Sequence, residues 1–221
     1  MAESQDDIRH EFDALLDRHG QTFADELGID VAKNTPAELF RLLCASTLMS
    51  ARIGSQIAVE AARNLAKRGW RSPQKLAEST WEQRVNALNE AGYARYQERT
   101  ATMLGDVTEH LLERYGGDLR KLRAEAEREP TAERKLLKEF KGLGDVGVDI
   151  FFREVQVAWD ELHPFADRRA LDAAGRLKLP KDAGKLAALV GQKDYPRLVA
   201  ALVRVELDDD FDAVRETARA A

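Results

Sequence analysis

Apolar residues recur at three- and four-residue steps along most of this chain, a spacing that places them on one face of a helix. The repeat is clearest on the two sides of a glycine-bearing segment at residues 140–147. Leu136, Leu137 and Phe140 lead into that segment. The apolar positions after it are Val148, Phe151, Phe152, Val155 and Trp159. The pattern predicts a helix, a tight turn and a second packed helix over residues 136–157.

Capping residues indicate where other helices begin and end. Thr35-Pro36-Ala37-Glu38 combines a capping threonine, a proline at the first helical position and a glutamate three residues after the cap. Ser72-Pro73 and Thr80-Trp81-Glu82-Gln83 predict two further helix starts. A longer helix is expected from Arg95 to Tyr115, where Gly116-Gly117 ends it.

The rest of the chain continues in the same way. A charged connection from Leu119 to Glu129 leads to a helix that starts at Pro130, and two more helices are expected beyond Pro180. A sustained alternation of β-branched and polar residues, which would predict a sheet, is missing from the sequence. The pattern therefore predicts an all-α protein.

Gly142 and Gly144 lie in the expected turn between the two packed helices. Glycine adopts positive φ readily, so a short turn here can point backbone N–H groups outward, and the start of the next helix adds more of them. Such groups form a site for a phosphate-sized anion. The alternative is a glycine that only caps the first helix, a common arrangement between packed helices.

Composition limits the partners that this pattern can have. Of the 221 residues, 44% are hydrophobic and 33% are charged, and the formal charge is −5. An acidic balance disfavours a protein whose whole surface coats nucleic acid, although a local basic face remains compatible with it. The sequence does not open with a basic segment followed by an apolar run, so we expect neither export nor a membrane span.

A second motif lies about twenty residues beyond the turn: His163-Pro164-Phe165-Ala166-Asp167 delivers an aspartate to the start of another expected helix. Together the two stretches resemble the helix-hairpin-helix DNA glycosylases, in particular their endonuclease III branch. Phe140, Gly142, Leu143 and Gly144 match that family's hairpin, and residues 39–52 resemble its first barrel helix. The resemblance covers residues 36 to 180.

The resemblance implies a fold and a set of site residues. It implies a helical barrel lobe from 36 to 157 and a second lobe formed by residues 1–35 plus 158–221, with the active cleft between them. It places Asp167 as the catalytic carboxylate, which can stabilise positive charge on the sugar or activate water. The residues placed at the DNA are Gly142, Gly144, Lys141, Arg52, Tyr93, Arg95 and Arg168.

Each of these roles has a plainer alternative. Asp167 could serve only as the cap of the helix that follows it, because aspartate is a preferred capping residue. Arg52 stands where the family keeps a glutamine that fills the gap left by the flipped nucleotide, but it could also be an ordinary surface arginine. Tyr93 is the candidate wedge into the duplex, with Arg95 and Arg99 near the DNA backbone, and could instead be a half-buried tyrosine.

Two departures from the family bear on chemistry. Val146 stands where the strand-cleaving members keep a lysine, and valine cannot form an imine with the opened sugar. Cys44 is the only cysteine, so the iron-sulfur cluster that many relatives hold on four cysteines cannot form within this chain. His10, His19, His110 and His163 lack metal-ligand spacing, and we expect neither a metal nor another cofactor.

We therefore expect a monomeric, cytoplasmic, nucleoid-associated protein of base excision repair that binds double-stranded DNA with a damaged base. The first hypothesis is a monofunctional DNA glycosylase, that is, a hydrolase that flips and excises the base. The second is a protein that grips DNA or an abasic site on the same fold without catalysis. A helical interaction protein with a purely structural hairpin is the third.

Overall fold

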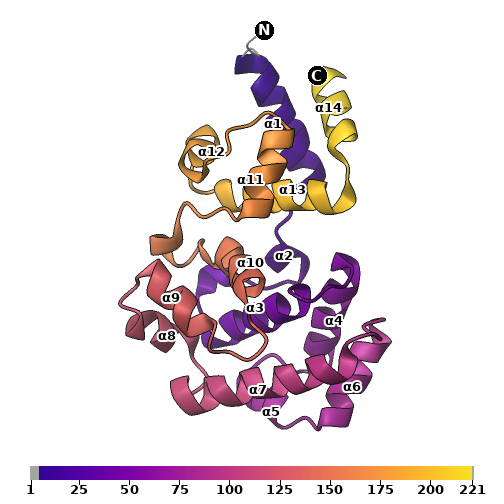
Figure 1. The fold of residues 1–221 in the computed structure, drawn as a ribbon, viewed down its shortest axis with the longest axis vertical. Coiled ribbons are helices and arrows are strands. Elements are labelled where there is room, and N and C mark those ends of the chain that lie inside the picture. The colour runs from indigo at the N-terminus through magenta and orange to yellow at the C-terminus, as the bar shows by residue number, and fades with distance from the viewer. Residues whose placement is uncertain (1–4, 221) are drawn as a thin grey trace. The chain divides into compact units, whose positions relative to one another are not determined.

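The computed structural model describes residues 5–220, and this part of the chain consists of helices and connections without a strand (Figure 1). The expected all-α class is confirmed. The chain divides into two compact units. The central unit runs from Leu27 to Glu161, and the terminal unit is formed by the chain up to Glu26 and from Leu162 on.

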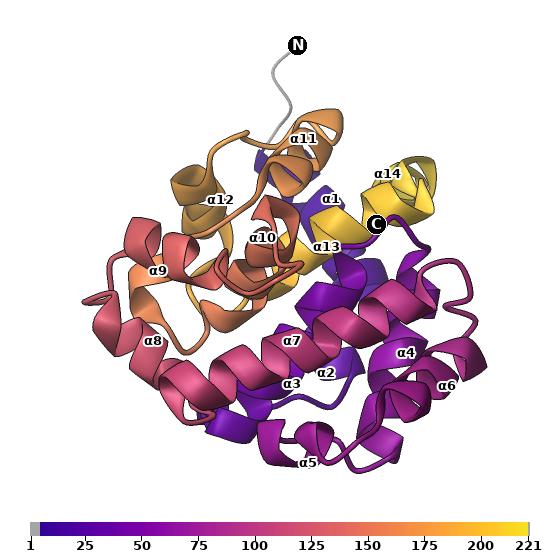
Figure 2. The same ribbon diagram turned by 60° about the horizontal axis from the view of Figure 1, so that its bottom comes forward.

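The central unit is built around α3 (Pro36–Met49), which packs against α4 (Ser55–Lys67) and α10 (Asp145–Val155). Its buried positions occupy nearly the whole circumference of the helix, so α3 is a core helix with neighbours on several sides. The remaining elements of the unit are η1 (Val31–Lys33), α5 (Pro73–Ala77), α6 (Trp81–Glu90), α7 (Gln97–Tyr115), α8 (Leu119–Glu125) and α9 (Pro130–Leu137). The long α7 runs past α5 and α6 (Figure 2).

The caps explain where these helices start. Thr80 forms a complete capping box, in which its hydroxyl accepts from Gln83 N at 3.2 Å and Gln83 Oε1 accepts from Thr80 N at 2.9 Å. Thr35 makes half of one: its hydroxyl accepts from Glu38 N, whereas the Glu38 carboxylate pairs with Arg41 at 2.9 Å. Both starts agree with the sequence prediction, because a cap is decided within four residues.

The charged stretch expected as a connection contains a helix. α8 is capped by Asp118, whose carboxylate accepts from Arg120 N at 3.0 Å, and it buries Leu119 and Leu122. Behind it, Arg123 pairs with Glu161 through two hydrogen bonds of 2.6 and 2.5 Å and lies over the ring of Trp159. The fully buried Glu133 sits next to this pair. Burial, followed by the neighbouring Glu161 carboxylate, raises the pKa of Glu133 to about 8.

The terminal unit joins the two ends of the chain. α1 (Gln5–His19) lies alongside α13 (Tyr195–Asp208) and α14 (Phe211–Ala220), and α11 (Arg168–Arg176) packs on α13 (Figure 1). Its other elements are the short α2 (Phe23–Glu26) and α12 (Ala183–Val190), and η2 (Asp160–Leu162) leads into it. α14 follows the aspartates at 208–210 and is a third helix beyond Pro180, where the sequence pattern predicts two.

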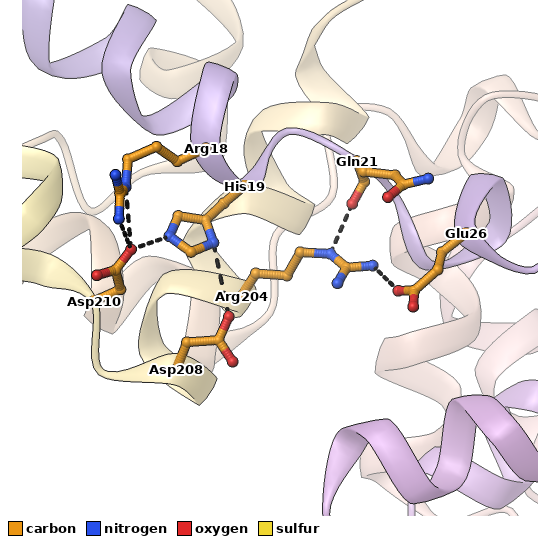
Figure 3. A network of polar contacts seen from close by, with 7 residues as sticks. All are labelled: Arg18, His19, Gln21, Glu26, Arg204, Asp208 and Asp210. Carbon is orange, nitrogen blue, oxygen red and sulfur yellow. Dashed lines mark hydrogen bonds and ion pairs between the residues drawn. The ribbon is translucent and has the colours of Figure 1, made fainter. Parts of the chain in front are cut away.

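Polar contacts hold the end of α1 to the α13–α14 corner (Figure 3). Asp210 Oδ2 accepts from Arg18 Nη2 at 2.8 Å and lies 2.9 Å from His19 Nε2. The Arg18 hydrogen bond is the main reason that the pKa of Asp210 lies below its usual range. Arg204 donates to the Gln21 carbonyl at 2.8 Å and to Glu26 at 2.5 Å, which fixes the segment that follows α1.

Candidate nucleic-acid interface

The expected helix-hairpin-helix is present in the central unit, with α9 ending at Leu137 and α10 beginning at Asp145. Leu143 N donates to the Phe140 carbonyl at 3.0 Å and closes the turn. Gly142 has a φ of +90°, and a Cβ built on it would lie 1.9 Å from Met103 Cε. Gly144 is the N-cap of α10 with a φ of −86° and open space around it. Only the first glycine of the pair is therefore required by the backbone.

An open pocket of about 300 Å³ lies beside the hairpin turn, within the central unit. Three stretches that are distant in sequence form it: the end of α3 with the loop after it, the start of α7, and the turn itself. The lining residues are Thr47, Ser50, Ala51, Arg52, Tyr96, Arg99, Thr100, Met103 and Gly142. We call this the hairpin pocket. The structure thus brings Arg52 and Gly142, two of the predicted DNA-contacting residues, into one site.

The hairpin pocket carries positive charge at its rim. Arg52 and Arg99 are exposed, and Arg95 is exposed with its guanidinium 5.3 Å from the ring centre of Tyr96. Among the described residues none of these three arginines forms an ion pair, and none of the lining residues is acidic. The three guanidinium groups, which we call the rim arginines, are therefore open to an anionic partner.

The hydroxyl groups of the pocket are already engaged by backbone. Thr47 Oγ1 donates to the Leu43 carbonyl at 2.9 Å, and Ser50 Oγ donates to the Thr47 carbonyl at 2.8 Å. Such bonds hold the side chains against their own helix. The arginines are consequently the main donors that the pocket offers to a ligand.

The cations next to the hairpin, unlike the rim arginines, form ion pairs. Lys138 Nζ donates to both carboxylate oxygens of Asp145 at 2.9 Å, and Arg134 pairs with Asp149 at 2.6 Å. Lys141, predicted as a phosphate contact, pairs with Asp106 on α7 at 2.7 Å. Each of these three cations thus has an acidic partner in its own unit.

The role predicted for Tyr93 does not agree with its position. Tyr93 is 0% exposed, and its hydroxyl donates to the Leu48 carbonyl at 2.9 Å. A wedge must project from the surface before it can enter a duplex, whereas this ring is part of the core. Tyr93 is buried because the chain turns inward after the end of α6. Tyr96, half-exposed at the hairpin pocket, is the aromatic ring of this segment that a ligand can reach.

Asp167 is the N-cap of α11 in the terminal unit. Its Oδ1 accepts from Ala170 N at 2.9 Å, and the side chain is 9% exposed. The capping alternative is therefore realised, which leaves the catalytic role as a prediction. Arg168, directly after the cap, is almost fully exposed and lies 3.5 Å from Asp172.

The residues do not suit the iron-sulfur cluster of the resembled family. Such a cluster needs four thiolates, and Cys44 is the single cysteine, buried on α3. Burial raises the pKa of its thiol to about 12, so it stays protonated near neutral pH. Within residues 5–220 no group of three or more histidine, cysteine, aspartate or glutamate side chains could hold a metal ion. The same residues contain no helix that is both long and apolar enough to cross a membrane.

Some residues of the hairpin pocket were missed in the sequence. Met103 lies within the helix expected from Arg95 to Tyr115 but was given no site role, and Thr47 and Thr100 were not singled out. Tyr96, Arg99, Thr100 and Met103 follow one another at helical spacing, which puts them on one face of the helix start. That spacing was the sequence signal that these four residues share one face. A second open pocket, of about 490 Å³, lies against the other face of α7, near Trp81, Thr102 and Glu109.

Comparisons with known proteins bear on the fold. A scan against protein-family models and a search of curated proteins both give no match. Among solved structures, the chain is similar to an endonuclease III trapped in a covalent intermediate with DNA, in an estranged-adenine complex. The TM-score is 0.51 at 17% identity, and the similarity covers 92% of this chain and 86% of that one. This chain therefore has the all-helical fold seen in endonuclease III.

Proposed function

We propose that this protein binds double-stranded DNA with a damaged base and excises that base as a monofunctional DNA glycosylase. The observation that carries the proposal is the hairpin pocket, where a helix-hairpin-helix turn, the end of α3 and the start of α7 meet under unpaired arginines. Its volume of about 300 Å³ suits a single small ligand group. The likeness in fold to an endonuclease III captured on DNA supports the same substrate class.

Asp167 is the residue proposed to carry the chemistry. Loss of a base from a deoxynucleotide builds positive charge on the sugar, and a carboxylate stabilises that charge or activates the attacking water. The hydrogen bond from Ala170 N fixes one carboxylate oxygen of Asp167. A group held in this way needs no reorganisation during the reaction, and this holding is the property that electrostatic catalysis requires.

The proposed reaction stops at base removal. Strand cleavage through an imine requires an unprotonated amine, and Val146 offers a side chain that is 61% exposed but has no nitrogen. Lys138 and Lys141 are engaged by Asp145 and Asp106. The expected product is an intact strand with an abasic site, which breaks only after alkali, and borohydride should trap no covalent complex.

The test is excision from a panel of duplexes that each carry one lesion. Asp167→Asn should lower the excision rate by at least about 100-fold and leave duplex affinity unchanged, because the amide oxygen can still accept from Ala170 N. Asp182→Asn is the matched control: Asp182 caps α12 in the same unit by accepting from Lys185 N at 2.8 Å. Excision that is insensitive to Asp167→Asn would exclude the proposed role of this carboxylate.

A second candidate function is a non-catalytic protein that grips DNA or an abasic site. The observation that favours it is the engagement of Asp167 in a helix cap, which accounts for the residue without catalysis. A wild-type protein that binds an abasic duplex but excises no lesion of the panel would establish this alternative.

A further inference from the structure

The charges around the hairpin and around the pocket beside it differ in a way that bears on how DNA would be held. This inference rests on the DNA-binding part of the proposed function. Backbone amides at a hairpin and the start of a helix attract phosphate because they carry partial positive charge. That attraction is useful only if the surrounding side chains do not cancel it.

At the hairpin, acidic side chains offset this attraction for phosphate. Asp145 is the first residue of α10, so its carboxylate lies at the end of the helix where a phosphate would bind. Its charge is matched by Lys138, while Asp149 and Asp106 match Arg134 and Lys141. If Lys138 turned away to meet a phosphate, Asp145 would keep only its longer contact with Arg134, at 3.6 Å, and its carboxylate would still lie beside that phosphate. Exposed ion pairs are weak, but their partners keep the local charge near zero.

The positive charge at the rim of the hairpin pocket is not neutralised by acidic side chains in this way. Arg52 follows α3, Arg95 precedes α7 and Arg99 is in its first turn, and the described residues provide none of them with an ion pair. Glu98 is the acid of this segment, and it is not among the residues that line the pocket. Arg52 and Arg99 therefore line an opening without acidic lining, and Arg95 lies next to it over the ring of Tyr96.

We infer that this chain holds the DNA backbone chiefly through Arg52, Arg95 and Arg99, and that its helix-hairpin-helix has become a structural turn with little phosphate affinity. The hairpin keeps its packing role: Phe140 and Leu143 are buried, and the Met103 side chain packs where a side chain at residue 142 would lie. The positive anchor lies at the mouth of the pocket that would receive the nucleotide.

The experiment measures the affinity of the full chain for a fluorescein-labelled duplex with one abasic-site analogue, over salt concentrations of about 50 to 200 mM. Removal of one phosphate contact should lower affinity about eightfold at roughly 0.1 M salt and reduce the slope of log K against log salt by about 0.9. Arg99→Gln and Arg52→Gln should each show this change, and Arg95→Gln/Arg99→Gln about twice the change in slope.

The hairpin variants provide the opposite expectation. Lys138→Gln and Lys141→Gln should change affinity by less than about twofold and leave the slope unchanged, because Asp145 and Asp106 already pair with these lysines. Arg71→Gln is the matched control for loss of one exposed arginine. Arg71 follows the far end of α4, a helix of 13 residues and thus about 20 Å long, whose near end adjoins the loop of Arg52.

The outcomes separate the two claims. A change in slope that appears in the Lys138 and Lys141 variants but not in the rim variants would overturn the inference and leave DNA binding itself intact. A wild-type protein that does not bind the duplex at any salt concentration would overturn the proposed function, and the inference with it. A slope of log K against log salt that is reduced only in the rim variants supports both the DNA-binding function and the inference.

Discussion

The two glycines of the hairpin look equivalent in the sequence, but they should respond differently to alanine. At Gly142 the backbone has a φ of +90°, where an L-residue is strained by about 1–2 kcal/mol. The new methyl group would also meet Met103 Cε at 1.9 Å, although this atom ends a flexible side chain and can move. Gly142→Ala should therefore reduce the free energy of unfolding of the central unit by about 1–2 kcal/mol, mostly through the backbone.

Gly144→Ala is the matched control. Its φ of −86° suits alanine and a Cβ there meets no atom within 4 Å. Alanine restricts the unfolded chain, which stabilises, but it is a poorer N-cap than glycine, so the two effects should cancel to within about 0.5 kcal/mol.

Urea unfolding followed by tryptophan fluorescence measures both variants. All three tryptophans of the chain, Trp70, Trp81 and Trp159, belong to the central unit, so the signal reports this unit even if the two units unfold separately. Repeating Gly142→Ala in a Met103→Ala background separates the two contributions, and the coupling should stay below about 0.5 kcal/mol. Equal stabilities of the Gly142 and Gly144 variants would refute the assigned turn geometry.

Two further predictions concern buried polar groups. Glu133 is held protonated because its pKa is raised from 4.5 to about 8, so its contribution to stability is fully present below 4.5 and is lost as the pH rises through about 8. Between about pH 7 and pH 9 the wild type should lose more stability than Glu133→Gln, by on the order of 1 kcal/mol, and parallel pH profiles in urea unfolding would contradict this. Tyr93→Phe removes the hydrogen bond to the Leu48 carbonyl and should cost about 1 kcal/mol in the same assay, whereas a surface tyrosine would lose nothing.

Features decided within a few residues could be predicted from the sequence. Thr35, Thr80 and Asp167 cap the helices that their local patterns indicated, and Gly116 ends α7 with a left-handed backbone. Periodicity likewise predicted the packed helices on both sides of the hairpin. The all-α class follows from these local signals together.

Features that depend on distant neighbours could not be predicted in this way. Tyr93 is buried because its hydroxyl reaches Leu48, and Lys141 is neutralised by Asp106, a residue 35 positions earlier on α7. The helix α8 was missed because charged residues outnumber Leu119 and Leu122, whose three-residue spacing was the only sign of a buried face. Which cations remain unpaired is decided by the fold, so the sequence named Arg52 and Arg95 together with Lys141 but could not separate the unpaired arginines from the paired lysine.

The central claim is that the hairpin pocket receives the nucleotide, and disulfide cross-linking to DNA tests it most directly. Cys44 is buried, so Ser50→Cys places a single accessible thiol in the hairpin pocket. Thr102→Cys is the matched control, because Thr102 is an exposed residue of α7 that lines the other open pocket. With a duplex that carries a thiol tether on the target base, Ser50→Cys should cross-link efficiently and Thr102→Cys should not. Cross-linking through Thr102→Cys alone, or equally through both positions, would contradict the account.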